Sequence, residues 1–459
     1  MEPDAITALA ADAYVYGSPL VRRLSAVRAC LREGCGTTPA APFNDFAHAD
    51  GPATPGTYTP YAPADLVDAL AQLDLSGGPV GLHVPDTGGA YYVLQFVDAW
   101  GNTFAYLGTR ATGTGDGDWL VVPPGWAGTV PDVVSGVIDA PTSVVSVLGR
   151  LVCDGPDDMP RVRALQQELT LTHLGDRAHR TGLPATEPGV PGELRFFEEL
   201  RVWTADFPPA AADRAYQDRF QPLGLLEEGL SPYVSASPRL VRALGRGLAL
   251  GRLRVEEAAR LPQVLAEGPP GAWQATPHLR DHNLDHLGVG TLGTPEWTLP
   301  DREASYLVRA VAARRGYRQP HGYEAVFAHT SRDSRGRMLD GAHRYALRFA
   351  QPPPVRAFWS LTAYDSPGGH LVTNAADRYA IGDRTPGLVH GDDGSLTLHL
   401  SAERPADSEG AANWLPLPPG AFRPVLRLHL PDQAVLDGSY VVPALERLGD
   451  PPGVEIPDL

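Results

Sequence analysis

The chain has 459 residues and a formal net charge of −16, which limits its fold and its partners. A chain of this length exceeds one ordinary hydrophobic core and is expected to divide into two or three domains. The acidic balance argues against a nucleic-acid backbone or an anionic membrane surface as a partner. The cysteines Cys30, Cys35 and Cys153 allow at most one disulfide, and we expect free thiols in a reducing compartment.

The N-terminal residues predict a cytoplasmic location. The acidic residues Glu2 and Asp4 stand where a secretion signal needs basic ones. No apolar run in the sequence reaches the length of a membrane-spanning helix.

Residues 1–158 are predicted to form a domain that combines a helix with a β-sandwich. Apolar residues at helical spacing predict a helix over residues 5–32, which Pro19 is expected to kink or restart. Residues 37–63 are rich in proline and glycine and predict a long loop of the kind that covers binding sites. A short helix is expected at residues 64–73. Short strands separated by turn residues, typical of an antiparallel sandwich or barrel, are predicted at residues 80–84, 91–97, 103–107, 119–122 and 143–152.

Residues 159–316 are predicted to form a helical middle region. The last helix begins after Asp301, a favourable capping residue, and ends before Gly316. The helical period, with proline or glycine between segments, predicts helices at residues 162–174, 192–203, 210–220, 238–248, 255–265 and 301–315.

Residues 317–459 are predicted to form a second β-sandwich, jelly-roll-like in arrangement. Phe358, Trp359 and Leu361 are expected in its core. Alternating runs predict strands at residues 345–349, 355–364, 371–372, 396–400 and 425–430. The fold class is therefore predicted to be α+β and predominantly β, with an N-terminal helix and sandwich, a helical middle and a C-terminal sandwich.

Motifs in both β regions resemble a known bacterial family. The C-terminal motifs are Leu339-Asp-Gly341, Phe358-Trp-Ser-Leu-Thr362, Tyr364-Asp365, Asn374, Arg378-Tyr379, Asn413-Trp-Leu-Pro416 and Arg427. They resemble domain of unknown function 1214. The upstream motifs are Ala13-Tyr-Val-Tyr-Gly17, Tyr91-Tyr92, Asp98, Asn102, Arg110 and Gly149-Arg150. They look like its usual N-terminal companion, domain of unknown function 1254. The resemblance implies a helix and sandwich followed by a jelly-roll-like domain, and no settled activity. Many relatives carry a secretion leader.

Polar residues at strand ends of the two β regions are the main candidates for catalysis. Strand ends on rigid sandwiches can converge on one pocket, and a carboxylate beside guanidinium groups suits acid–base work or anion binding. We expect Asp98 to accept a proton, Arg110 and Arg378 to bind an anion or oxyanion, and Tyr364 to orient the substrate. Substrate-binding side chains are expected to be Tyr16, Arg23, Asn102, Trp359, Asp365, Asn374 and Trp414. The competing interpretation is structural, because Asp and Arg at sheet corners commonly satisfy backbone groups or form interdomain ion pairs.

Three histidines, His278, His282 and His286, follow one another at steps of four residues. On a helix they would share one face but span about 12 Å, whereas ligands of one metal lie about 2 Å from it. Only two of the three could share an ion. No metal is expected, and a site on His282 and His286 is kept as an alternative.

The sequence thus predicts a cofactor-independent enzyme that performs acid–base hydrolysis, elimination or cyclisation on a small molecule between the two β domains. One alternative is a non-catalytic binding protein that holds a glycan or hydrophobic metabolite on aromatic strands. The other is a histidine-ligated metalloenzyme. A small molecule is the expected partner, nucleic acid and membrane are not, and a homo-oligomer is left open.

Overall fold

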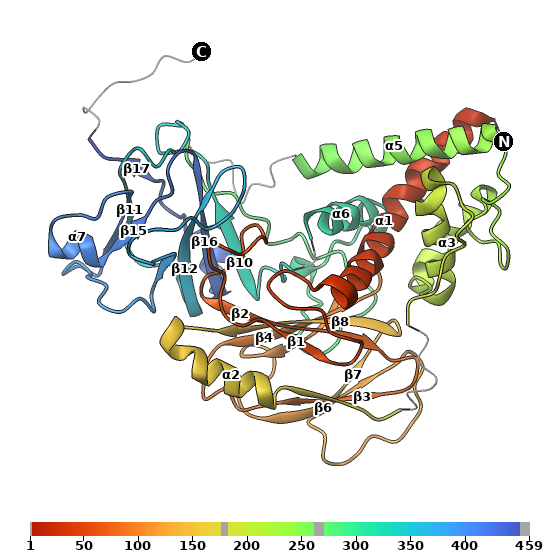
Figure 1. The fold of residues 1–459 in the computed structure, drawn as a ribbon, viewed down its shortest axis with the longest axis horizontal. Helices are drawn as coiled ribbons and strands as arrows, with labels where there is room; N and C mark the ends of the chain where they lie inside the picture. The colour runs from red at the N-terminus through yellow and green to blue at the C-terminus, as the bar shows by residue number, and fades with distance from the viewer. Residues whose placement is uncertain (1, 176–181, 261–269, 317, 450–459) are drawn as a thin grey trace.

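The structure is a computed structural model that describes residues 2–175, 182–260, 270–316 and 318–449. Figure 1 shows a β-sandwich from the first third of the chain at the bottom, a second from the C-terminal part at the upper left, and long helices at the upper right. The predicted α+β class is confirmed. In the described part of the chain, no helix combines the length and the hydropathy needed to cross a membrane.

The N-terminal sandwich consists of a five-stranded sheet, ordered β1-β2-β8-β4-β5, and a four-stranded sheet, ordered β7-β6-β3-β9, as far as the described residues show. The strands are β1 (Phe46–His48), β2 (Leu66–Asp74), β3 (Val80–Val84), β4 (Tyr92–Asp98), β5 (Thr103–Gly108), β6 (Gly117–Val122), β7 (Gly136–Asp139), β8 (Val144–Val152) and β9 (Thr170–His173). Helix α2 (Met159–Glu168) adds Val162 and Leu165 to the apolar cluster between these sheets. Both α2 and β9 therefore pack with this sandwich, beyond residue 158.

Strand β2 corrects the prediction of a short helix at residues 64–73. All of its residues are buried, and it pairs antiparallel with β1 on one side and along its whole length with β8 on the other. Its leucines, alanines and glutamine favour a helix in isolation, but by only a few tenths of a kcal/mol each. Complete pairing and burial on both faces outweigh that preference. The polar members find partners: Asp68 pairs with Arg318, and Gln72 accepts a hydrogen bond from Ser146.

The helical layer packs around helix α1 (Pro3–Glu33). This helix is continuous through Pro19, so the predicted restart is absent. Pro19 has no N–H to donate to the Val15 carbonyl, and Ser18 Oγ donates to that carbonyl instead. Helices predicted separately at residues 238–248 and 255–265 form one helix to Arg260, and residues 261–265 lie outside the described residues. This merged helix is α5 (Pro238–Arg260), and the other helices of the layer are α3 (Arg195–Asp206), α4 (Arg214–Asp218) and α6 (Arg302–Arg315).

The C-terminal sandwich has two four-stranded sheets in the described residues, ordered β10-β16-β12-β13 and β15-β14-β11-β17. The strands are β10 (Ala325–His329), β11 (Tyr345–Phe349), β12 (Val355–Asp365), β13 (Ala380–Gly382), β14 (Leu396–Ser401), β15 (Trp414–Pro416), β16 (Phe422–Pro431) and β17 (Glu446–Arg447), with short helices α7 (Ser408–Ala412) and α8 (Gln433–Leu436). Residues 371–372, predicted as a strand, lie in an irregular segment that follows the turn after β12.

Strand β12 presents its two faces to different environments. Trp359 and Leu361 lie in the core of the C-terminal sandwich, as predicted. Phe358 instead packs with Tyr91 and Leu430 in a cluster between the two sandwiches. Because side chains alternate along a strand, the residues on the Phe358 face are directed toward the N-terminal domain.

Helices α1 and α5 approach closely at Gly247, which yields a direct test of this packing. A Cβ atom at Gly247 would lie 2.6 Å from the Thr7 carbonyl oxygen and would also meet the Ala10 methyl group. At Gly245, on the same helix, a Cβ atom would meet nothing within 4 Å. We expect Gly247→Ala to lower the free energy of unfolding by about 1–3 kcal/mol and Gly245→Ala to raise it by about 0.5–1 kcal/mol. Urea unfolding monitored by circular dichroism measures both, and equal stabilities would contradict this close packing.

Candidate functional site

A cleft of about 530 Å³ lies between the two sandwiches. One wall comes from the N-terminal domain, and includes residues 51–55 of the predicted long loop, residues 64–65 and residues 153–156. The other wall comes from β12 and from residues 376–386 around β13. The volume falls within the range of small-molecule pockets, and position between two domains is a common place for them.

Asp65 provides a buried carboxylate to the cleft. It stands immediately before β2, where its carbonyl accepts the Cys153 N–H at 3.0 Å, and it is only 7% exposed. Neither carboxylate oxygen accepts a hydrogen bond from the residues that the structure describes. Arg384 Nη2 lies 3.6 Å from Oδ2, which is an ion-pair contact but too long for a hydrogen bond. A buried carboxylate without hydrogen bonds is energetically unfavourable. A ligand that donates a hydrogen bond to it therefore stabilises the complex.

Ser360 and Arg384 add two further polar groups from the opposite wall. Ser360 lies on the Phe358 face of β12, is 3% exposed, and its Oγ makes no hydrogen bond within the described ranges. The Arg384 guanidinium lies 3.9 Å from the centre of the Phe358 ring and hydrogen-bonds Asp154, while its Nε has no partner among the described residues. The cleft therefore combines an acceptor, a hydroxyl and a cation.

The rest of the lining is mainly apolar. Small aliphatic, proline and sulfur-containing side chains surround the polar groups: Pro52, Ala53, Pro55, Cys153, Pro156, Met159, Ile381 and Pro386. Such a lining fits an apolar body better than a highly charged one.

Two of the sequence-predicted residues, Trp359 and Arg378, line this cleft. Arg378 Nη1 donates to the carbonyls of Ala412 at 3.1 Å and Trp414 at 2.8 Å, so its guanidinium is engaged with the backbone at the start of β15. Asn374 holds the preceding turn by donating to the Arg378 carbonyl at 3.0 Å.

Trp414 and Asp365 take positions inside the C-terminal domain. The Trp414 indole is buried and donates to the Ser401 carbonyl at 3.0 Å. Asp365 accepts the His370 N–H at 2.6 Å and closes the turn after β12. Neither residue lines the cleft.

Arg110 and Tyr364 make hydrogen bonds that cross between the two domains. Arg110 Nε pairs with Glu324 Oε2 at 2.7 Å, and burial raises the pKa of Glu324 against the opposing effect of this guanidinium. The Tyr364 hydroxyl donates to the Ala62 carbonyl at 2.7 Å and accepts from Arg427 Nη2 at 2.7 Å. These contacts agree with the structural interpretation of interdomain pairs.

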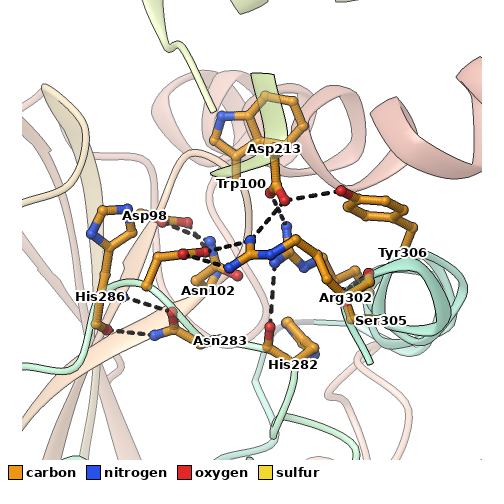
Figure 2. A network of polar contacts seen from close by, with 12 residues as sticks. Asp98, Trp100, Asn102, Asp213, His282, Asn283, His286, Arg302, Ser305 and Tyr306 are labelled. Carbon is orange, nitrogen blue, oxygen red and sulfur yellow. Dashed lines mark hydrogen bonds and ion pairs between the residues drawn. The ribbon is translucent and has the colours of Figure 1, made fainter. Parts of the chain in front are cut away.

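Asp98 and Asn102 lie elsewhere, in the polar network drawn in Figure 2. Asp98 accepts the Asn102 N–H at 2.8 Å and the Asn102 side-chain amide at 2.9 Å, which closes the turn between β4 and β5. Burial raises the pKa of Asp98, while the bonds from Asn102 oppose the shift. The adjoining cavity of about 10 Å³ has room for about one water molecule.

Asp213 is the centre of this network. It is 1% exposed and accepts from Arg302 at 2.7 Å, Arg309 at 3.0 Å and the Tyr306 hydroxyl at 2.9 Å (Figure 2). Tyr16 packs edge-on against the Tyr306 ring, and burial and then the Asp213 charge raise its pKa. Of the predicted site residues, Tyr16 thus joins Asp98 and Asn102 around one ion cluster, separate from the cleft.

Asp213→Asn is expected to lower the free energy of unfolding by about 3–5 kcal/mol, because removing one member of a buried ion cluster leaves its partners uncompensated. The matched control is Asp218→Asn on α4, an exposed position that should change stability by less than about 0.5 kcal/mol. Urea unfolding at neutral pH compares the two variants. Similar stabilities would show that the bonds between Asp213 and helix α6 do not stabilise the fold.

The segment that carries His278, His282 and His286 is not helical in the structure. Residues 278–286 form turns, in which His278 pairs with Asp281 at 2.6 Å and His282 Nδ1 lies 3.2 Å from the Leu279 carbonyl oxygen. His286 uses its backbone to bind Asn283. Burial lowers the pKa of His282 well below its ordinary value. Among the described residues, no group of three or more His, Cys, Asp or Glu side chains is arranged to hold a metal ion.

The predicted convergence of Asp98, Arg110, Arg378 and Tyr364 on one pocket is therefore not what the structure shows. Asp98 and Arg378 line different cavities, and the other two line neither. Sequence reasoning missed Asp65 because the predicted helix at residues 64–73 included it. It also missed Arg384, which lies in the turn after β13 in the structure. Ser360 belonged to the recognised motif, and strict alternation along β12 could have assigned it to the outer face.

His321, between the two domains, gives a pH-dependent test of the buried interface. It stacks on Tyr323, its Nδ1 lies 2.8 Å from the Tyr106 hydroxyl, and burial lowers its pKa to about 3. The unfolded chain binds the histidine proton below about pH 6.5 and the folded chain does not, so stability present above that pH is lost as the pH falls, by about 1.4 kcal/mol per pH unit.

His321→Asn keeps an acceptor at the Nδ1 position and cannot be protonated. We expect the free energy of unfolding of this variant to fall less than that of the wild type between about pH 7 and about pH 5, with a difference of about 1.4 kcal/mol per unit below about pH 6.5. His390→Asn, at an exposed position, is the control and should follow the wild type. An unchanged slope for His321→Asn would contradict a neutral, buried imidazole.

The fold and cleft define an α+β protein built from two sandwiches with a helical layer, and comparisons identify its family. Residues 43–173 match the model of a family described as protein of unknown function (DUF1254), and residues 324–433 match that of a second family described as protein of unknown function (DUF1214). The chain belongs to the family that combines these two domains, as its motifs predicted. No curated protein matches it.

Two solved structures are similar to this chain. The crystal structure of the VPA0106 protein from Vibrio parahaemolyticus has a TM-score of 0.73 at 24% identity, covering 96% of this chain and 100% of that one. An uncharacterised protein from Burkholderia cenocepacia gives a TM-score of 0.42 at 13% identity, over 95% of this chain and 88% of that one. The first likeness establishes the shared fold.

Proposed function

We propose that the chain is a cofactor-independent enzyme that acts on a small molecule in the interdomain cleft by acid–base chemistry. The observation that carries this proposal is the Asp65 carboxylate, which is buried in the wall of a cleft of about 530 Å³ and receives no hydrogen bond from the described residues. Buried polar groups are nearly always paired, so an exception that lines a cleft favours a role in binding or proton transfer. The proposal includes a cytoplasmic location, supported by three cysteines that are free thiols.

The lining of the cleft indicates the class of substrate. The apolar walls suit a compact hydrophobic body, and Asp65 needs a donor, such as a hydroxyl or an amine, on that body. A hydroxylated alicyclic or aromatic compound satisfies both requirements. A polyanion would meet three carboxylates on the lining, Asp65, Asp154 and Asp377, against two guanidinium groups, Arg378 and Arg384, of which Arg378 is engaged with backbone carbonyls, and is disfavoured.

Each polar group has a distinct part in the proposed chemistry. Asp65 accepts a proton from the substrate, which is the role expected of Asp98 from the sequence. Negative charge that develops on the substrate is stabilised by the Arg384 guanidinium, which lies close to Asp65. Ser360 orients the substrate through its hydroxyl, which has no partner among the described residues. Hydrolysis, elimination and cyclisation can all use such a proton transfer.

The test uses the full chain and a panel of alicyclic and aromatic alcohols and amines. Native mass spectrometry identifies compounds that bind, and chromatography with mass spectrometry follows their conversion. For any compound that binds, Asp65→Asn is expected to weaken binding about 10-fold or more, the effect of losing one charge-assisted hydrogen bond, and to lower turnover by about 10²–10⁴-fold.

Asp157→Asn is the matched control, because Asp157 is exposed and follows the cleft residue Pro156 without lining the cleft itself. It should bind and turn over the compound as the wild type does. A compound that binds Asp65→Asn and the wild type equally would place the site elsewhere. Binding that depends on Asp65 but leaves the compound unchanged would establish a binding protein in place of an enzyme.

A further inference from the structure

The C-terminal end of helix α1 brings Cys30 and Cys35 together. Cys30 lies in the last turn, and the chain reverses at Gly34, where φ is 90° and the N–H donates to the Cys30 carbonyl at 3.2 Å. Cys35 and Thr38 then exchange two backbone hydrogen bonds, at 3.0 and 3.2 Å. This tight turn returns the chain beside the last turn of α1, where the two thiols interact closely enough to shift each other's pKa.

Charged groups from three elements surround this thiol pair. Arg23 comes from α1, Arg318 from the segment after α6, and Asp68 from β2. The Arg318 guanidinium lies so close to Gly36 that a Cβ atom there would overlap its Nη1, and it forms an ion pair with Asp68. The two arginines favour a thiolate, and the Asp68 carboxylate opposes it.

The two thiols differ in proton affinity and in access. The interaction with the Cys30 thiol, followed by the effect of the arginines, lowers the pKa of Cys35 to about 6, against burial and Asp68. The same interaction and burial raise the pKa of Cys30. Cys35 is partly exposed and packs against the cluster of Leu70, Val97, Leu148 and Ala313, whereas Cys30 is 9% exposed. The less buried of the two residues is therefore the one whose thiol ionises near neutral pH.

We propose that Cys30 and Cys35 form a redox-active dithiol that hydroperoxides convert to an intramolecular disulfide. The Cys35 thiolate attacks one peroxide oxygen, the O–O bond breaks, and the departing oxygen takes up a proton and leaves as water or an alcohol. Cys35 is then a sulfenic acid. The Cys30 sulfur attacks Cys35 Sγ, the S–O bond breaks, and water leaves as the S–S bond forms. Two electrons pass from the thiols to the peroxide. This proposal does not depend on the function assigned to the cleft.

Alkylation of the wild-type chain tests the ionisation without any substitution. The rate of iodoacetamide labelling at Cys35, read by peptide mass spectrometry across a pH series, is expected to have its midpoint near pH 6. An ordinary thiol has its midpoint near about pH 8.5. Cys153 is the internal control, because burial raises its pKa. A Cys35 midpoint equal to that of an ordinary thiol would overturn the proposal.

Hydrogen peroxide then tests the disulfide. Arg32 lies between the two cysteines, so trypsin separates them, and the oxidised chain should yield two peptides joined through Cys30 and Cys35 that part on reduction. Cys30→Ser should stop at a Cys35 sulfenic acid that dimedone traps, and Cys35→Ser should lose the reaction. Cys153→Ser should behave as the wild type. Oxidation of Cys153 at the same rate as Cys35, or a sulfenic acid in the wild type that never resolves, would refute a functional pair.

Discussion

The ion pair between Arg110 and Glu324 constrains how the two sandwiches pack. Glu324 is 1% exposed and stands directly before β10, so its charge must be balanced by groups from the other domain. Arg110 supplies a guanidinium at 2.7 Å, and the Tyr91 hydroxyl donates at 3.0 Å. Loss of either partner would leave a buried carboxylate short of hydrogen bonds, at a cost of several kcal/mol. The two domains are therefore fixed in one relative position.

A second set of bonds joins the long N-terminal loop to the outer face of the β10-β16-β12-β13 sheet. Arg427 on β16 donates to the Tyr61 carbonyl and to the Tyr364 hydroxyl, both at 2.7 Å. The same sheet face carries Ser360, whose hydroxyl makes no hydrogen bond among the described residues. Both ring nitrogens of His429, on the same face of β16, also lack a partner among the described residues, but Ser360 and Asp65 line the cleft, where a ligand can bind to them.

Much of the fold could be predicted from residue periodicity. The strands expected at residues 80–84 and 345–349 have these bounds in the structure. In residues 80–84, alternating burial leaves a clear period-two pattern. Strand β2 could not be found in this way, since burial on both faces removes the alternation and leaves only a misleading helical composition. Because residues 64–73 were predicted as a helix, Asp65, immediately before β2, was not considered as a site residue.

The site was harder to predict than the fold because it depends on which sheet faces meet. The sequence selected Asp98 and Arg110 as catalytic residues of one pocket, but Asp98 bonds to its neighbour Asn102 and Arg110 pairs with Glu324 from a distant segment. Periodicity does not show which distant segments meet. The separation of Trp359 from Phe358 shows the same limit. Alternation assigns neighbours to opposite faces, yet it does not say which face belongs to a sandwich core and which to an interface.

Strand β2 connects the two proposed sites. Asp65 precedes the strand at the cleft, and Asp68 holds Arg318 beside Cys35; three residues of extended chain separate them by about 10 Å. The strand is paired with β8 over its whole length, so it cannot slide when the thiols react. Oxidation would instead remove the thiolate charge next to Arg318 and strengthen that guanidinium's hold on Asp68, since one fewer anion competes for it. The dithiol thus acts on the electrostatics of β2 while the geometry of the cleft is preserved.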